Sequence, residues 1–309
     1  MNPNPGPQPH APGLDRRRFV QVTSAAAGLL TAPEAGADPK VDGRSLPQDL
    51  QFIDVNATLG RWPLRRVPLD EAGELVARLR RLGALQAWVA HFDALLHKDL
   101  GGVNARLAAE CRRHGRGFLL PFGSINPLHP DAEEELRRCD EVHRMPGLRL
   151  FPNYHGYSLD HPGFVRLLES AAARGLIAQI ALTLEDERMM HPLMRVEPVD
   201  TSPLVALAKR LPHLRLVLVN ALRTLRAKPL LDLIAAGNVS VEIAALEGLG
   251  GLATLLGQVP ASRILFGSHA PLFHPEAAVL KLRESAPAPG DLAALCRNNA
   301  QRLLQRPPE

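Results

Sequence analysis

The stretch Phe52-Ile53-Asp54-Val55 is a short, largely apolar run, and it is the first of eight such runs along the chain. The others are Ala87–Ala90, Phe118–Phe122, Leu148–Phe151, Ile177–Leu182, Leu214–Val219, Val239–Ile243 and Ile264–Phe266. Between them lie longer segments with apolar residues at three- and four-residue spacing, such as Leu69–Leu82, Asp131–His143, Pro162–Arg174 and Pro203–Leu211. Short buried runs that alternate with amphipathic helices indicate βα units around a parallel sheet. Eight units in about 250 residues predict a single α/β domain, a (β/α)8 barrel of the TIM type.

Two more helical patterns, near Pro275–Ser285 and Asp291–Leu304, predict extra C-terminal helices and leave no room for a second domain. The chain has 309 residues and a formal net charge of +4, with its one tight basic cluster near the N-terminus. This balance argues against a nucleic-acid partner. Outside the N-terminus no apolar run is long enough to predict a stable membrane span.

The N-terminal segment has the composition of an export signal. Residues 1–13 are rich in Pro, Asn and Gly, which predicts disorder. The stretch Asp15-Arg16-Arg17-Arg18-Phe19-Val20-Gln21 resembles a twin-arginine motif, and a mildly apolar run and an Ala35-Gly36-Ala37 cleavage site follow it. The alternative is a chance arginine triplet before an Ala-rich helix. The expected organisation is a signal peptide over 1–37, a linker over 38–51, a barrel over 52–304 and a tail over 305–309, with delivery to the periplasm by the twin-arginine export machinery.

Polar side chains follow nearly every predicted strand. They are Asn56, Thr58, His91, Asp93, Asn126, Asn153, His155, Glu185, Asp186, Asn220, Glu242 and His269. Strand ends are often polar simply because they meet solvent. In a (β/α)8 barrel, however, the carboxyl ends of the strands carry the chemistry, so the set also predicts a polar mouth that binds a small molecule.

Four stretches resemble the amidohydrolase-related family of metal-dependent hydrolases. Residues 52–60 resemble its opening strand, which normally reads Ile-Asp-x-His-x-His, and residues 147–157 its fourth-strand stretch. Residues 264–271 resemble its Gly-Ser-Asp-x-Pro segment, and residues 298–304 its closing Asn-Ala-x-Arg-Leu helix. The resemblance covers residues 52–304 and implies a metal-dependent barrel enzyme.

The departures from the family pattern fall on the metal ligands. Asn56 and Thr58 stand in place of the two first-strand histidines, Asn220 near the strand-six histidine, and His269 in place of the strand-eight aspartate. Strand five offers only Gln179. Neutral amides and hydroxyls bind divalent metals weakly, so the resemblance implies a metal centre that this chain has lost.

Two hypotheses about function follow. In the first, the chain is a hydrolase or lyase with a rebuilt site: His269 is a general acid or base, His155 supports it and Glu242 orients it. A variant of this hypothesis holds a relocated divalent metal with some of His91, His155, His269 and Glu242. In the second, the chain is a non-catalytic binding protein of the periplasm.

Five side chains complete the predicted site as substrate-binding residues: Asn56, Arg149, Asn220, His91 and Trp62. For Arg149, an anionic substrate group and an internal ion pair are equally consistent with its place in strand four. Trp62, in Gly60-Arg61-Trp62-Pro63, belongs either to a structural lid or to the binding surface. The substrate, the oligomeric state and the presence of a metal stay open.

Overall fold

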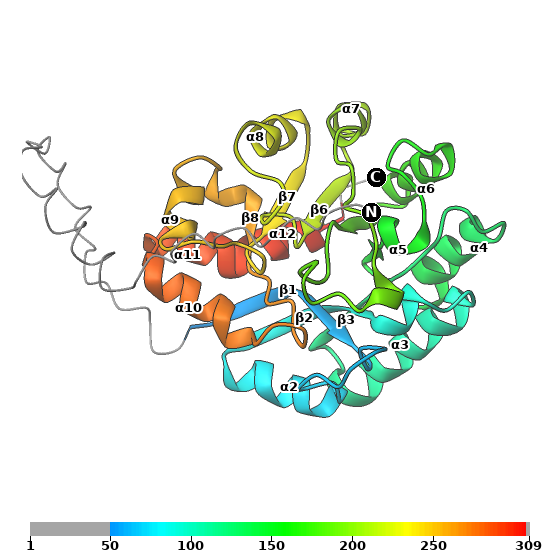
Figure 1. Ribbon diagram of the computed structural model, residues 1–309, viewed down its shortest axis with the longest axis horizontal. Coiled ribbons are helices and arrows are strands. Elements are labelled where there is room, and N and C mark those ends of the chain that lie inside the picture. The colour runs from blue at the N-terminus through cyan, green and yellow to red at the C-terminus, as the bar shows by residue number, and fades with distance from the viewer. Residues whose placement is uncertain (1–49, 307–309) are drawn as a thin grey trace, which may run out of the picture. The chain divides into compact units, whose positions relative to one another are not determined.

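The structure is a computed structural model that describes residues 50–306 (Figure 1). The predicted signal peptide, nearly all of the linker and the last three residues lie outside the described residues. Export therefore stays a prediction. None of the helices within residues 50–306 has the length and apolarity needed to cross a bilayer.

Eight parallel strands follow one another in chain order around a barrel, which confirms the predicted fold. They are β1 (Phe52–Leu59), β2 (Ala84–His91), β3 (Leu119–Gly123), β4 (Gly147–Leu150), β5 (Ile177–Ala181), β6 (Arg215–Val219), β7 (Val239–Glu242) and β8 (Ile264–Leu265). The segment after β8 closes the ring against β1: the Val55 N–H donates to the Phe266 carbonyl at 3.0 Å, and the His269 N–H donates to the Asn56 carbonyl at 2.7 Å. Because β8 has only two residues, the segment 266–270 that follows it makes the contacts with β1 at the carboxyl end of the barrel.

Helices surround the strands in the same order. They are α2 (Ala72–Arg81), α3 (Leu100–Gly115), α4 (Ala132–Arg137), α5 (Pro152–His155), α6 (Pro162–Ala173), α7 (Leu204–Arg210), α8 (Ala227–Ala236), α9 (Gly251–Leu256), α10 (Pro275–Ser285), α11 (Pro289–Ala293) and α12 (Asn299–Leu304), with short 3-10 and π turns between some of them. In Figure 1 helices α6, α7 and α8 lie outside β5, β6 and β7. Each long helix buries one apolar face, as α6 does with Phe164, Leu167 and Leu168.

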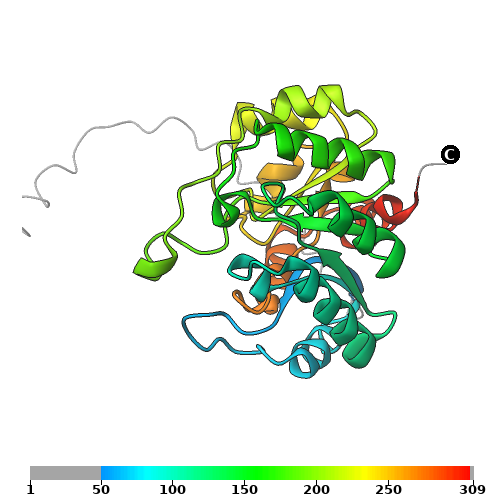
Figure 2. The same cartoon turned by 90° about the vertical axis from the view of Figure 1, so that its right-hand side faces the viewer.

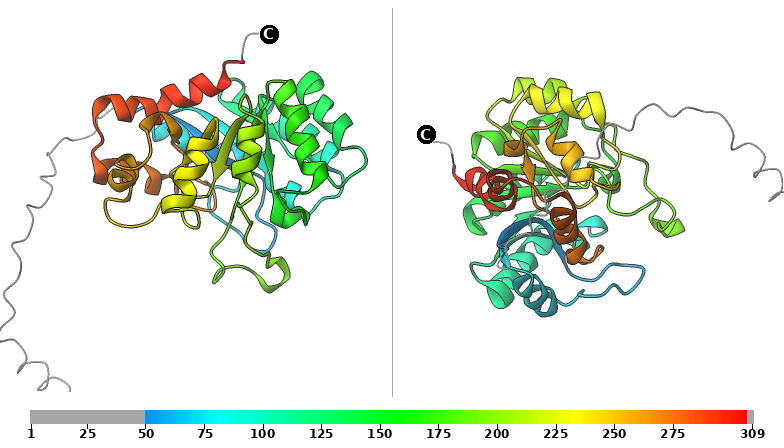
Figure 3. Two further views of the ribbon diagram at one scale, coloured as in Figure 1. Left: turned by 90° about the horizontal axis from the view of Figure 1, so that it is seen from above. Right: turned by 90° about the vertical axis from the view of Figure 1, so that its left-hand side faces the viewer.

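Two ends of the barrel differ in what covers them. The loop after β1 and the long loop after β5 project together from one end, whereas α12 lies at the other (Figures 2 and 3). An ion pair between Arg65 and Glu185 joins the two loops. Just after β8 the Phe266 N–H donates to the Leu295 carbonyl at 3.0 Å, which ties the C-terminal helices to the end of this strand. The end with the loops is the carboxyl end, where barrel chemistry is found.

Strand β1 is longer than its apolar run and contains an irregularity. Its pairing with β2 shifts register between Asp54 and Ala57. An extra residue in one strand of a pair leaves a backbone group without its ladder partner. Here the freed Val55 carbonyl accepts hydrogen bonds from Arg149 at 3.0 Å and from Gln179 at 2.8 Å. The polar residues in the middle of β4 and β5 are therefore explained by a defect in β1.

Candidate active site at the carboxyl end of the barrel

Four side chains that the sequence placed at separate strand ends meet in one hydrogen-bonded cluster. The Asn56 amide donates to Asn220 Oδ1 at 2.7 Å and to Glu242 Oε1 at 3.3 Å. The Asn220 amide donates to the Thr183 carbonyl at 2.8 Å and lies 3.3 Å from His269 Nδ1. We call Asn56, Asn220, Glu242 and His269 the mouth cluster. All four are buried, with no more than 2% of any of them exposed.

The backbone at two members of the cluster takes the left-handed conformation. Asn220 has φ of 55° and His269 has φ of 58°. Non-glycine residues rarely adopt this region, and Asn, Asp and His are enriched among those that do. The backbone turns here at the ends of β6 and β8, and both side chains reach carbonyls of the loop after β5, those of Thr183 and Leu184.

His269 is neutral in this environment. Its Nε2 lies 2.8 Å from the Leu184 carbonyl, which can only accept, so Nε2 carries the proton and Nδ1 accepts from the Asn220 amide. Burial lowers the pKa of His269 from 6.5 to about 4. At neutral pH the imidazole therefore presents an unprotonated Nδ1 whose one contact is long.

Glu242 orients the cluster from below. Its Oε1 accepts the Asn220 N–H at 2.6 Å, and its Oε2 accepts the Ala244 N–H at 2.6 Å. Burial raises the pKa of this carboxyl group, and the two backbone donors act in the opposite direction. A Cβ at Gly267 would lie 2.2 Å from Oε2, so glycine is required where β8 passes the carboxylate.

The mouth cluster does not fit a divalent metal as it is arranged. A metal ligand must offer a lone pair; the single lone pair of His269 Nδ1 accepts the Asn220 amide, and each Glu242 oxygen accepts at least one N–H of the chain, so a metal would have to displace or crowd these hydrogen bonds. Asn56 donates its amide N–H groups to Asn220 and Glu242, and Asn220 donates to His269 and to the Thr183 carbonyl. The relocated site also does not assemble, because no three His, Cys, Asp or Glu side chains within residues 50–306 come together as a metal-binding group.

Arg149 makes all of its hydrogen bonds within the chain. Its five N–H groups reach Gln179 Oε1 at 2.7 Å, the carbonyls of Ala57 at 2.7 Å, Val55 at 3.0 Å and Trp88 at 3.2 Å, and Thr58 Oγ1 at 3.4 Å. Burial lowers its pKa to about 10, so it stays charged at neutral pH. Every donor is used by the chain, which gives Arg149 a role in holding β1 against β2, and its predicted role in substrate binding stays a prediction.

Trp62 and His91 also take structural positions. Trp62 is buried, and its ring packs edge-on against Phe92 with centroids 5.1 Å apart, so it contributes to the core and not to a binding surface. His91 Nδ1 accepts the Asp93 N–H at 3.1 Å, and its Nε2 lies 3.6 Å from Glu110. Neither residue forms a hydrogen bond with the mouth cluster.

His155 lies apart from His269. Its Nε2 donates to the Ala94 carbonyl at 2.8 Å, while its buried Nδ1 has no hydrogen-bond partner among the described residues. Burial lowers its pKa, which favours the neutral ring. Because none of its hydrogen bonds reaches the mouth cluster, its predicted support of His269 has no counterpart in this geometry.

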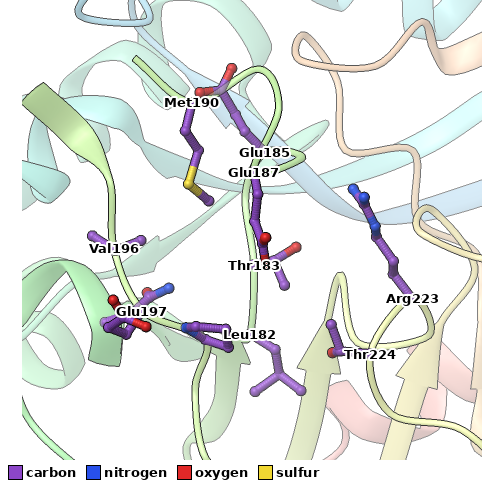
Figure 4. Close-up of a pocket in the computed structure, with 11 residues that line it drawn as sticks. Leu182, Thr183, Glu185, Glu187, Met190, Val196, Glu197, Arg223 and Thr224 are labelled. Carbon is purple, nitrogen blue, oxygen red and sulfur yellow. The ribbon is translucent and has the colours of Figure 1, made fainter. Parts of the chain in front are cut away.

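A cavity of about 170 Å³ opens beside the mouth cluster. Asn220 and His269 form part of its wall, together with Arg223 from the loop after β6 and Lys281 from α10. A smaller cavity of about 60 Å³ adjoins it and shares Thr183, Glu185 and Arg223 with it. Figure 4 shows the smaller cavity, with Arg223 on one side and Val196 and Glu197 on the other. No sequence pattern indicated Lys281, because one lysine in an amphipathic helix normally faces solvent.

Comparison with known proteins agrees with this architecture. A family model described as amidohydrolase matches residues 53–306, while a search of curated proteins finds no match. Solved structures with the same fold include 5-carboxyvanillate decarboxylase from Sphingomonas paucimobilis, at 16% identity and a TM-score of 0.64, covering 82% of this chain and 99% of that one.

Two further structures are similar. A putative amidohydrolase from Staphylococcus aureus matches at 12% identity and a TM-score of 0.62, covering 82% of this chain and 99% of that one. A dihydroxybenzoic acid decarboxylase from Polaromonas, solved with manganese and an inhibitor, matches at 14% identity and a TM-score of 0.63, covering 82% and 96%. With the family model spanning the whole barrel, the chain belongs to the amidohydrolase family.

Proposed function

We propose that this amidohydrolase-family barrel acts on a small polar molecule held in the 170 Å³ cavity beside His269, and that it does so without the family's metal centre. One observation carries the proposal. At the positions where the family pattern has metal ligands, Asn56, Asn220 and His269 bond to one another and to Glu242. The hydrogen bonds hold these strand ends together, which is the structural task that a bound metal performs in other members.

The reaction class is hydrolysis or bond cleavage of the lyase type, with His269 as the proton-transferring group. Its Nε2–H is fixed on the Leu184 carbonyl, so Nδ1 is the basic atom, and a ligand can displace the long contact from Asn220. Glu242 is a positioning residue, because it is fully buried and acts on the site through Asn220. The similar decarboxylase from Polaromonas was solved with manganese bound, whereas here His269 Nδ1 and both Glu242 oxygens accept N–H groups of the chain.

A second candidate function is binding without turnover. The observation that favours it is that both ring nitrogens of His269 and both oxygens of Glu242 already have partners in the chain. A catalytic base needs a free lone pair at the moment of reaction, whereas a binding wall does not.

The test compares His269→Ala with His213→Ala, since His213 is exposed on a loop. The protein is purified without chelator, its zinc, iron and manganese are measured, and hydrolysis of small esters, lactones and amides is assayed. The proposal expects well under one metal equivalent, and activity or ligand binding that His269→Ala removes and His213→Ala keeps. A stoichiometric metal whose removal unfolds the protein would overturn it. Binding without turnover would select the second candidate.

We also propose that the chain is exported to the periplasm by the twin-arginine route. The support is the Arg16-Arg17 pair, the apolar run after it and the Ala35-Gly36-Ala37 site. Replacing both arginines by lysine keeps the charge and removes the motif, so the protein is expected to stay in the cytoplasm. Unchanged delivery of the double variant to the periplasm would refute export by this route.

A further inference from the structure

Lys281 reaches the cavity from outside the ring of strands. It lies in α10, and its Nζ donates to the carbonyl of Ile243 at 2.9 Å and to that of Ala244, just beyond the end of β7. The same side chain lines the 170 Å³ cavity together with Asn220 and His269. An ammonium group has three N–H donors, and the backbone uses two of them. The third is left for whatever occupies the cavity.

Among the charged side chains that line the cavity, Lys281 is the one that forms no ion pair with another described side chain. Glu185 pairs with Arg65, and Asp186 pairs with Arg223 at 2.7 Å. Glu247 pairs with Arg226 at 3.2 Å. Lys281, in contrast, forms no ion pair with any side chain between residues 50 and 306, and its two hydrogen bonds go to neutral carbonyls. Burial lowers the pKa of Lys281, while the more distant carboxylates of Glu242 and Glu247 act in the opposite direction without forming an ion pair with it.

The rest of the wall limits the size and character of the occupant. A cavity of about 150 Å³ lined by apolar side chains holds a molecule the size of benzene. The apolar part of this wall is formed by Leu184, Ala245, Leu246 and Phe273. Three carboxylates, those of Glu185, Asp186 and Glu247, also border it, and although each is paired with an arginine, they disfavour a ligand with two negative charges more than a ligand with one.

We propose that the cavity binds a small monocarboxylate with a compact apolar body, and that Lys281 selects it through a charge-assisted hydrogen bond to the carboxylate. The inference rests on the proposed function, because it takes the cavity beside His269 to be the ligand site. It adds the chemical class of the ligand and names α10 as the element that provides specificity. Inorganic phosphate, which is a mixture of monoanion and dianion near neutral pH and has no apolar body, binds more weakly than the monocarboxylate.

The experiment uses cyclopentanecarboxylate and its neutral isostere cyclopentanecarboxamide as probes, with affinities measured by calorimetry or ligand-observed NMR. The full-length protein is expected to bind the carboxylate at least tenfold more tightly than the amide. Lys281→Gln keeps hydrogen-bond donors near the two carbonyls but removes the charge, so this preference disappears while amide binding changes little. Lys209→Gln, at an exposed position in α7, leaves the preference intact and controls for the net charge.

A second measurement does not depend on the variant folding. Acetylation of wild-type lysines is followed by mass spectrometry, and the carboxylate is expected to protect Lys281 but not Lys209, with the amide protecting neither. Equal affinity for the two probes, no binding of either, or a preference that survives in Lys281→Gln would overturn the inference. If His269→Ala abolishes binding of both probes while Lys281→Gln keeps the carboxylate preference, the proposed function stands and only the anion assignment fails. If His269→Ala binds each probe with the same affinity as the wild-type protein does, the proposed function fails.

Discussion

The barrel holds two groups of buried polar side chains that differ in whether anything is left to bind. Around Arg149, in the middle of β4, each donor has a partner in the chain, and three of the partners are backbone carbonyls of β1 and β2. Around His269, at the mouth, the side chains border a cavity, and Lys281 keeps a donor to spare. Both groups looked alike in the sequence, as polar residues in or after apolar runs.

The difference teaches that a buried polar group indicates function only where the chain does not satisfy all of its hydrogen bonds and a cavity lies beside it. Arg149 corrects a defect in the β1–β2 pairing, and removing it should damage the fold. The mouth residues hold strand ends that meet solvent-accessible space, and removing them should change binding or pH response more than folding. Single substitutions within each group test whether this division holds.

The largest effect is expected at Arg149. Arg149→Met keeps the length and apolar stem but leaves the Ala57 and Trp88 carbonyls and Gln179 Oε1 without their donor. The free energy of unfolding should fall by about 3–5 kcal/mol, because buried acceptors then lack partners. Denaturant unfolding measures the loss. Arg137→Met, at a solvent-exposed pair on α4, is the control and should cost far less. Equal losses in the two variants would contradict the structural role of Arg149.

The next effect is a pH dependence at His269. Its pKa is lowered from 6.5 to about 4 in the folded chain, so between these values the unfolded chain binds a proton that the folded chain does not. The stability that the neutral ring contributes is fully present above about pH 6.5 and is lost as the pH falls toward 4. The loss amounts to about 3 kcal/mol. His269→Gln should remove this part of the pH dependence, whereas His213→Gln should keep it. Parallel curves for wild type and His269→Gln would show that the ring is not buried as described.

The smallest effect is expected at Ser240, inside the barrel on β7. Its Oγ is buried and has no hydrogen-bond partner within the described chain. Ser240→Ala removes an unsatisfied polar atom, so unfolding should become more difficult by no more than about 1 kcal/mol. Ser268→Ala is the contrasting variant, because the Ser268 hydroxyl donates to Asp54 Oδ2 at 2.5 Å and its loss should destabilise the fold. A clear loss of stability in Ser240→Ala would reveal a partner, such as a buried water.

The fold could be predicted because buried parallel strands leave continuous apolar runs. All eight runs became strands, although β1 extends four residues further, through Asn56 and Thr58, than its apolar run indicated. The register shift in β1 was not predictable, because a bulge depends on pairing with β2 and not on local composition. The role of Arg149 follows from that bulge. From the sequence alone, Arg149 could be assigned only to an anionic substrate group or to an internal ion pair.

The candidate site was predicted in part. Asn56, Asn220, Glu242 and His269 were expected at strand ends, and the structure joins them through hydrogen bonds. His155, His91 and Trp62 were expected beside them, yet side-chain direction turns each toward a different neighbour. Their catalytic or binding roles stay untested by any assay. The reach of Lys281 across to β7 depends on how α10 packs, which no periodicity encodes.

The left-handed backbone at Asn220 and His269 has an evolutionary consequence. A β-branched or bulky apolar residue is strained in this conformation, whereas Asn, Asp and His adopt it more readily. The residues tolerated by the turn are therefore largely those that can also hold a metal or exchange a proton. A metal-binding relative with histidine at the first position and aspartate at the second can share one main-chain path with this protein. Gain or loss of the ion between such relatives then requires replacement of side chains alone, with no remodelling of the loops that carry them.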